Sequence, residues 1–339
     1  MRHVLLFGHQ SLVNAFRARG WRVTTVSYQR TADIVSETFP VDACAAYRRA
    51  CRVAPVDLAM FCDESQLPLW THIGELPVPT VWYAVDSHIH GDWHQDWQAL
   101  YDVVLVAQKS KLPLYRERRD HGPVFWCPLY ADHTRLRPPK YQRDSEVVFV
   151  GNLDAHVNPA RVAFFDELTK LVDVRVRQGP YEQLYGISSI GLNQSLDGEL
   201  NFRNFEVLAS GAALVTEAGT DALSDCLTEG RHYVTYKRSD VEDCASVIHG
   251  LLDDPARVEA LRYRGYEAVL TSHLDIHRVD QIENWLASVD LDALVARRFS
   301  APNAWRDPNI RVFEFASEVY NSHGRSREAE AYRIMAQAV

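Results

Sequence analysis

Buried strands alternate with helices of about ten residues along most of this chain. The pattern begins with HVLLFG at residues 3–8, and VFWCPLY at residues 124–130 closes its first run. It restarts with EVVFVGN at residue 146 and continues through ISSIGLN and AALVTE. Strands separated by helices form parallel sheets with helices on both faces. The sequence therefore predicts an α/β protein with two doubly wound domains.

A polar segment separates the two runs. It reads DHTRLRPPKYQRDS at residues 132–145 and contains the pair Pro138-Pro139, which is typical of a linker. We expect a first domain at residues 1–137, a second domain at 145–288, and a helical tail at 289–339. Closure of two such domains would use a hinge at this linker.

Composition excludes several classes of function. A net charge of −9 argues against broad nucleic-acid binding, and no apolar run approaches the roughly 18 residues of a membrane span. The first residues enter a strand without the layout of a signal peptide. The six cysteines form no C-x-x-C pair. Reduced thiols in a cytoplasmic protein are the expectation. The turn FGHQSL lacks the glycine pattern of a dinucleotide site, and no P-loop occurs.

The stretch at residues 191–217 is the strongest candidate for a site. It reads GLNQSLDGELNFRNFEVLASGAALVTE, which predicts a strand end, a polar loop, a helix over residues 201–210 with Gly211 as its C-cap, and a buried strand. In open α/β sheets, ligands bind beyond the carboxyl ends of the strands. Helix N-termini at that edge favour anions.

Two charged residues share one face of this helix. Arg203 and Glu206 are three positions apart. A guanidinium in the first helical turn opposes the dipole, and a phosphate bound in bidentate fashion would offset this. The carboxylate one turn later could accept hydrogen bonds from ribose hydroxyls. The alternative is a surface ion pair of little energetic value.

The run NFRNFEVLASGAALVTE resembles the donor-site signature of GT-B glycosyltransferases, most of all the group similar to the spore-maturation CgeB proteins. VVFVGNL at residues 147–153 agrees, and the resemblance covers roughly residues 145–285. It implies two Rossmann-like domains of GT-B type with a C-terminal helical hairpin. It also implies sugar transfer from a nucleotide-diphosphate donor, such as a UDP-sugar, to a glycan, protein or small-molecule acceptor. The donor would be a co-substrate, with no metal and no other cofactor.

The resemblance also suggests site residues. The donor nucleotide and diphosphate would be bound by Gly151, Asn152, Arg161, Asn193, Ser195, Asn201, Phe202, Arg203 and Glu206. Many retaining members carry a second glutamate eight residues before the position of Glu206. That position is Gly198 here, and its neighbour Glu199 becomes the candidate for contact with the donor sugar.

The first domain, residues 1–137, would bind the acceptor and contains a cluster of acid/base groups. It lies in VWYAVDSHIHGDWHQDW at residues 81–97, where a strand ends and an expected loop at 86–94 precedes a helix at about 95–100. Asp86 and His88 form the candidate catalytic pair, with His9 after the first strand as a further candidate. A metal site is the rival interpretation, because D-x-H-x-H offers three ligands. Capping and loop hydrogen bonds are the third.

The tail predicts two amphipathic helices around Gly324. Ala329 and Tyr332 have the A-x-x-Y spacing that resembles a single tetratricopeptide hairpin. The hairpin either packs on the C-terminal domain or serves as a docking surface for a homodimer or a partner protein. The D-x-D at residues 290–292 lies in a helical region and is interpreted as a surface or capping feature.

Two alternative functions remain open from the sequence. A nucleotide-sugar epimerase would share the two-domain layout and would turn over a donor without an acceptor. A non-catalytic partner subunit would act through the helical tail.

Overall fold

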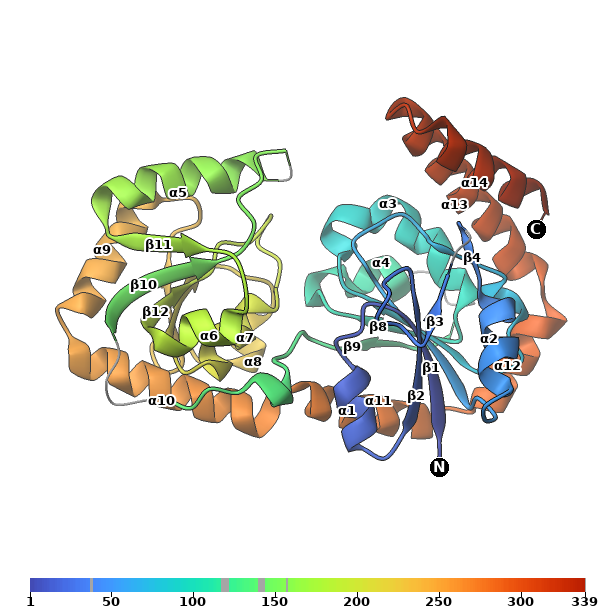
Figure 1. The fold of residues 1–339 in the computed structure, drawn as a ribbon, viewed down its shortest axis with the longest axis horizontal. Helices are drawn as coiled ribbons and strands as arrows, with labels where there is room; N and C mark the ends of the chain where they lie inside the picture. The colour runs from blue at the N-terminus through green and yellow to red at the C-terminus, as the bar shows by residue number, and fades with distance from the viewer. Residues whose placement is uncertain (37–38, 117–121, 140–143, 157, 339) are drawn as a thin grey trace. The chain divides into compact units, whose positions relative to one another are not determined.

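The chain forms two compact units. The structure, a computed structural model, describes residues 1–36, 39–116, 122–139, 144–156 and 158–338. Unit 1 consists of Met1–Cys127 and Val279–Val339, and unit 2 consists of Pro128–Arg278. Each unit is a doubly wound α/β fold (Figure 1), which confirms the predicted fold class.

The strands of unit 1 form a parallel sheet in the order β3-β2-β1-β5-β7-β8-β9. Their bounds are β1 (His3–Gly8), β2 (Arg22–Ser27), β3 (Ile34–Val35), β5 (Leu58–Cys62), β7 (Thr80–Ala84), β8 (Val103–Val106) and β9 (Val124–Trp126). A small sheet pairs β4 (Val41–Asp42) with β6 (Trp70–Thr71). The helices are α1 (Val13–Ala18), α2 (Ala43–Cys51), α3 (Ser87–Trp97), α4 (Leu112–Arg116), α12 (Leu291–Ser300), α13 (Asn303–Ser322), α14 (Ser326–Ala338) and most of α11 (Asp275–Ala287).

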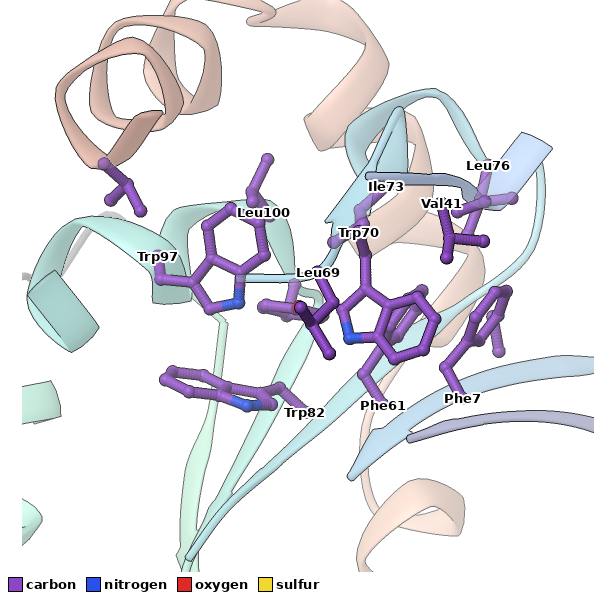
Figure 2. Close-up of a cluster of buried hydrophobic side chains, with 14 of the residues drawn as sticks. Phe7, Val41, Phe61, Leu69, Trp70, Ile73, Leu76, Trp82, Trp97 and Leu100 are labelled. Atoms are coloured by element: carbon purple, nitrogen blue, oxygen red, sulfur yellow. The ribbon is translucent and has the colours of Figure 1, made fainter. Parts of the chain in front are cut away.

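Aromatic side chains dominate the core on one face of this sheet. Phe61 and Trp82 from the strands pack with Trp70 and Trp97 around Leu69 (Figure 2). The residues of β5 and β7 are buried throughout, as expected for central parallel strands covered on both faces.

The histidine-rich segment is helical, which corrects the expected loop. Helix α3 begins at Ser87, eight residues before the expected helix start near Gln95. Trp93, His94 and Trp97 recur at helical spacing and are all buried. Burial of this face stabilises a helix that its glycine and histidines alone would not predict.

The tail packs on unit 1, and the prediction that it packs on the C-terminal domain is wrong. Arg298 of α12 is buried and donates to both carboxylate oxygens of Asp102, at 3.1 and 3.2 Å. Phe313 of α13 contacts Trp97, and Tyr332 of α14 stacks on Tyr320.

The predicted helical hairpin is confirmed, and so is the interpretation of the D-x-D at residues 290–292 as a capping feature. Gly324 has the left-handed backbone (φ 72°) that ends α13 and starts the turn before α14. Asp290 caps α12 by accepting the Ala293 N–H at 2.9 Å.

The strands of unit 2 form a parallel sheet in the order β11-β10-β12-β13-β14. Their bounds are β10 (Asp144–Val150), β11 (Val174–Arg177), β12 (Ser188–Leu192), β13 (Ala213–Glu217) and β14 (Tyr233–Tyr236). The helices are α5 (Pro159–Leu171), α6 (Tyr181–Leu184), α7 (Arg203–Ala209), α8 (Leu223–Cys226), α9 (Val241–Leu252) and α10 (Pro255–Ser272). Helices α5 and α9 share a core with the strands, and α7 packs where Gly191 of β12 leaves room for Val207.

The unit boundaries differ from the expected ones at 137–145 and 288. The chain passes between units at 127/128 and 278/279, so Pro138-Pro139 lies inside unit 2 and is not the crossing point. Two contacts explain this. The Arg137 N–H donates to the Ala209 carbonyl at 2.9 Å. The buried guanidinium of Arg278 donates to the carbonyls of Pro128 and Leu129, at 2.8 and 3.2 Å.

No helix in the described part of the chain combines the length and the apolar character that a membrane crossing requires.

Removal of the buried ring of Tyr332 should have a large effect on stability. Tyr332→Ala should lower the free energy of unfolding by about 3 kcal/mol, because it removes a fully buried aromatic ring. Ile334→Ala on the same helix is the control and should change it by less than about 0.5 kcal/mol, because Ile334 is exposed. Urea unfolding followed by fluorescence measures both. Equal midpoints for the two variants would contradict the packing of the tail.

Candidate functional site

The topological switch of unit 2 lies between β10 and β12. The chain leaves β10 through α5 to reach β11 on one side, and then returns to β12 on the other side. In open parallel sheets, ligands bind outside the carboxyl ends of the strands at such a point. Gly151 and Asn152 follow β10, and Asn193 and Ser195 follow β12. The structure thus brings these four predicted donor residues to one edge.

Arg203 extends from the start of α7 over the end of β10. Its Nε donates to the Val150 carbonyl at 2.8 Å, and its Nη1 donates to Asn193 Oδ1 at 2.9 Å. The guanidinium lies 4.6 Å from the centre of the Phe149 ring. Gly151 makes this approach possible, because a Cβ there would lie 2.7 Å from Nη2 of Arg203.

Arg161 brings a second guanidinium to the same place. It lies in the first turn of α5, and its Nε and Nη2 donate to Oε1 and the carbonyl of Gln194, at 2.8 and 3.1 Å. Burial lowers the pKa of Arg161, and the neighbouring Arg203 lowers it further. Among the described residues, neither guanidinium forms an ion pair with a carboxylate. Because an arginine stays charged in proteins, this edge carries two positive charges that no described carboxylate contacts directly.

Asn193 is the buried centre of the loop. Its Oδ1 accepts from Arg203 and, at 3.0 Å, from Asn201. Its Nδ2 donates to Asn204 and Thr216, at 3.1 and 2.9 Å. Since these bonds occupy its side chain, Asn193 positions Arg203 and Asn201.

Glu199 presents a carboxyl oxygen that has no partner. Its Oε1 accepts from Asn201 Nδ2 at 3.2 Å, whereas its Oε2 is buried and makes no hydrogen bond to a described residue. Burial raises the pKa of Glu199 to about 7, against the effect of Asn201 and of the guanidiniums. Near neutral pH this group can therefore donate or accept a hydrogen bond.

Glu206 lies one turn after Arg203 on α7, as the spacing predicted. Burial raises its pKa to about 7, Arg203 and Arg135 oppose this, and Glu182 adds to it. Arg203 and Glu206 form no ion pair in the described structure, so the surface-pair alternative does not apply. The Glu206 carboxyl remains available for a ligand.

The remaining predicted donor residues have structural partners. The Ser195 N–H and hydroxyl both donate to Glu217 Oε2, at 2.9 and 2.5 Å, so both groups already have a partner. Asn152 accepts the Asp154 N–H at 3.0 Å. The Phe202 ring meets the Tyr130 ring edge-on at 5.3 Å. Sequence reasoning missed Glu217, although a buried strand ending in a carboxylate was a usable signal.

The acid/base groups of unit 1 gather at its own carboxyl edge. Asp86 follows β7 and accepts a hydrogen bond from Ser65. Burial lowers the pKa values of His9 and His90, and the Asp86 carboxylate opposes this in both cases. Burial lowers the pKa of His94, and His90 and then His88, both on α3, lower it further. The three predicted catalytic residues thus belong to one neighbourhood.

Asp63 is the member of this group that sequence reasoning missed. It follows β5 and accepts N–H bonds from Ser65, Val85 and Asp86, at 3.1, 3.3 and 3.1 Å. Its Oδ2 lies 4.0 Å from His94 Nε2. Burial, and then the charge of Asp86, raise the pKa of Asp63 to about 7.

A possible metal geometry occurs elsewhere. Among the described residues, Asp132, His133 and Asp275 are the group whose ligand atoms lie within 4.8 Å of one another. His133 Nδ1 is 2.9 Å from Asp275 Oδ1, which also accepts the Ile276 N–H at 2.9 Å. Asp275 thus bonds both the loop at His133 and the start of α11. The segment at 86–94 provides no such group in the described structure.

Comparison with known proteins agrees with this geometry. Residues 142–284 match the profile of a family described as Glycosyl transferase-like. A search of curated proteins found no match. Sucrose-phosphate synthase from Thermosynechococcus elongatus is 13% identical with a TM-score of 0.57, over 86% of this chain and 100% of that chain. HepE from Anabaena, in complex with UDP and glucose, is 11% identical with a TM-score of 0.60, over 85% and 100%. The chain has the GT-B fold.

A third structure with the GT-B fold is an alpha-glucosyltransferase in complex with UDP-glucose and DNA containing an abasic site. It is 12% identical with a TM-score of 0.60, over 85% of this chain and 99% of that chain. At these identities the likeness establishes the fold. The chemistry of this GT-B chain has to be argued from its own residues.

Glu199 gives the site a pH dependence. Carbon-13 NMR of its side-chain carboxyl should titrate with a midpoint near 7, because burial disfavours the charged form. A folded pKa above the unfolded value costs stability as pH rises from about 4.5 through 7. Glu199→Gln should therefore be more stable than the unaltered protein at pH 8 and similar to it at pH 4.5. A midpoint near 4.5 would contradict the burial of this carboxyl.

Proposed function

We propose that this chain is a glycosyltransferase that moves a sugar from a nucleotide-diphosphate donor, with UDP as its nucleotide, to a hydroxyl-bearing acceptor. The observation that carries the proposal is the pair of guanidiniums, Arg161 and Arg203, which have only neutral oxygens as described partners. The matched family profile and the UDP complexes of two structural neighbours support it.

The guanidinium pair suits a leaving diphosphate. Negative charge develops on this group as the glycosidic bond to the donor breaks, and preorganised cations stabilise that charge. Two arginines can supply the positive charge that a metal ion supplies in other transferases. We therefore propose transfer that does not require a metal.

The two glutamates suit the rest of the donor. Glu206, with its free carboxyl one turn from Arg203, would bind the ribose hydroxyls. Glu199 would use Oε2 to bind a hydroxyl of the donor sugar. Asn193 and Asn201 would hold these groups in place, and Gly151 would keep room for Arg203.

Unit 1 would bind the acceptor. Asp86, His88 and His9 would supply a base for the acceptor hydroxyl in an inverting reaction, and Asp63 joins them by position. We further propose that the chain belongs to the CgeB-like group. None of its six cysteines, all of which the structure describes, forms a disulfide, which fits a cytoplasmic location.

An assay of UDP-sugars with and without acceptor sugars tests the activity. Transfer of the sugar to an acceptor is the expected result. Conversion of the donor sugar without an acceptor would instead support the epimerase, and donor binding without turnover would support the non-catalytic subunit.

Loss of the guanidiniums should weaken nucleotide binding. Arg203→Met and Arg161→Met should each lower UDP affinity by roughly ten- to a hundredfold, because each removes charge-assisted hydrogen bonds. Arg231→Met is the matched control, since Arg231 is exposed in the same unit and should leave the affinity unchanged. Calorimetry measures all three, and unaltered affinity in both site variants would remove the diphosphate assignment.

Gly151 should affect UDP binding only because its lack of a side chain leaves room for Arg203. In Gly151→Ala the new Cβ would meet Arg203 Nη2 at 2.7 Å and Phe149 Cζ at 2.8 Å, so the guanidinium must shift. We expect UDP affinity to fall about tenfold. Gly250→Ala on α9 is the control, because a Cβ there meets nothing within 4 Å. Equal affinities in the two variants would show that the approach of Arg203 to β10 is irrelevant to binding.

A further inference from the structure

Unit 1 contains a small pocket beside Asp63. Its walls include the aromatic side chains of Phe61, Trp70, Trp82, Trp93, Trp97 and Tyr101. Figure 2 shows four of these side chains, the ring of Phe61 and the indoles of Trp70, Trp82 and Trp97, around Leu69. The free volume is about 20 Å³, which is room for one water molecule or one hydroxyl group but not for a sugar ring.

Two hydrogen-bond donors in this wall lack acceptors. Trp93 is 5% exposed, and its indole Nε1 is buried without a partner among the described residues. Tyr101 is 3% exposed, and its buried hydroxyl donates to no described residue. The Trp97 indole lies beside that hydroxyl, but an indole only donates, so the Tyr101 proton still needs an acceptor. Burial raises the pKa of Tyr101, which keeps this proton in place.

The charged groups at the pocket are acidic. Asp63 and Glu64 line it, and no basic side chain is among its described lining residues. A carboxylate or phosphate would be repelled here. A hydroxyl oxygen can accept from the indole and from the phenol, and a hydroxyl proton can be donated to a carboxylate.

We propose that this pocket binds one hydroxyl group of a neutral sugar or polyol, with Trp93 and Tyr101 as donors and Asp63 as acceptor. This proposal rests on the proposed function and names the class of acceptor: neutral and hydroxyl-rich, with one hydroxyl-bearing arm inserted into unit 1. The body of the acceptor lies outside the pocket. The aromatic walls exclude water from the inserted arm, so its hydrogen bonds gain strength.

The Trp93 indole N–H reports occupancy directly. In nitrogen-15 NMR spectra of the full chain, the eight tryptophans give indole signals, and the Trp93 signal is the one missing from Trp93→Phe. The probes are glycerol, glucose, galactose and N-acetylglucosamine, with formate as a small anion. We expect a saturable shift of the Trp93 signal with at least one neutral probe, and none with formate.

Variants then test the residues. Asp63→Asn and Trp93→Phe should weaken binding of the active probe about tenfold, by calorimetry, because each alters one hydrogen bond. Trp285→Phe, a partly buried ring outside the pocket lining, should bind as the unaltered protein does. An unmoved Trp93 signal with every neutral probe would show a pocket for water only and would overturn the proposal. An equal shift with formate would contradict selection of a neutral hydroxyl, and unweakened binding in both pocket variants would show that the probe binds elsewhere.

UDP calorimetry on the same samples separates the two proposals. Normal UDP binding with an unmoved Trp93 signal would overturn the pocket and leave the proposed function standing. A shifted signal without UDP binding would overturn the proposed function, and the pocket would then remain as a polyol site without its role as an acceptor site.

Discussion

Two guanidiniums lie against one phenyl ring in unit 2, and their described hydrogen-bond partners are neutral oxygens. The guanidinium carbons of Arg161 and Arg203 lie 5.7 and 4.6 Å from the centre of the Phe149 ring. Both guanidiniums donate hydrogen bonds to backbone carbonyls and side-chain amides. The two like charges repel, since Arg203 adds to the effect of burial in lowering the pKa of Arg161, and partial burial strengthens the repulsion. An anion between them would relieve it. The rest of the site is arranged to keep this pair in position.

The fold maintains the pair through short-range packing. The bare backbone of Gly151 allows Arg203 to approach β10, and the buried Asn193 amide fixes both Arg203 and Asn201. The same amide bonds to Thr216 of β13, which couples the loop to the sheet. The proposed anion site is thus built on a rigid strand edge, with Glu199 and Glu206 on either side of Arg203 in sequence. Rigid placement is what lets a site favour developing charge without reorganisation.

The local pattern of unit 2 was predictable from the sequence. The spacing of Arg203 and Glu206 fixes their common helical face, and Gly211 ends the helix with positive φ as expected. Polar residues after buried strands predicted the edge where the site lies. The role of Ser195 was less predictable, because its partner Glu217 is 22 positions away and pairs with it only through the parallel register of β12 and β13.

Several features of unit 1 could not be predicted from the sequence, because they depend on long-range packing. Helix α3 contains histidines, a glycine and bulky indoles, so local propensity favoured a loop, and only burial against the sheet decides the matter. In the sequence, Asp63 follows its strand without a motif that marks it as an acid/base group. Only the order of the strands in the sheet places it beside Asp86 and His94. The tail returns to unit 1 through long-range contacts such as Arg298 with Asp102, 196 positions apart, which no sequence pattern encodes.

The central claim is that unit 2 binds a diphosphate through its guanidinium pair. Calorimetry of the unaltered protein with UDP, UMP and uridine tests it most directly, because the three ligands share a base and a ribose and differ only in phosphate. The account predicts that affinity falls from UDP to UMP to uridine, and that the gap between UDP and uridine narrows as salt is added. Equal affinity for UDP and uridine would contradict it.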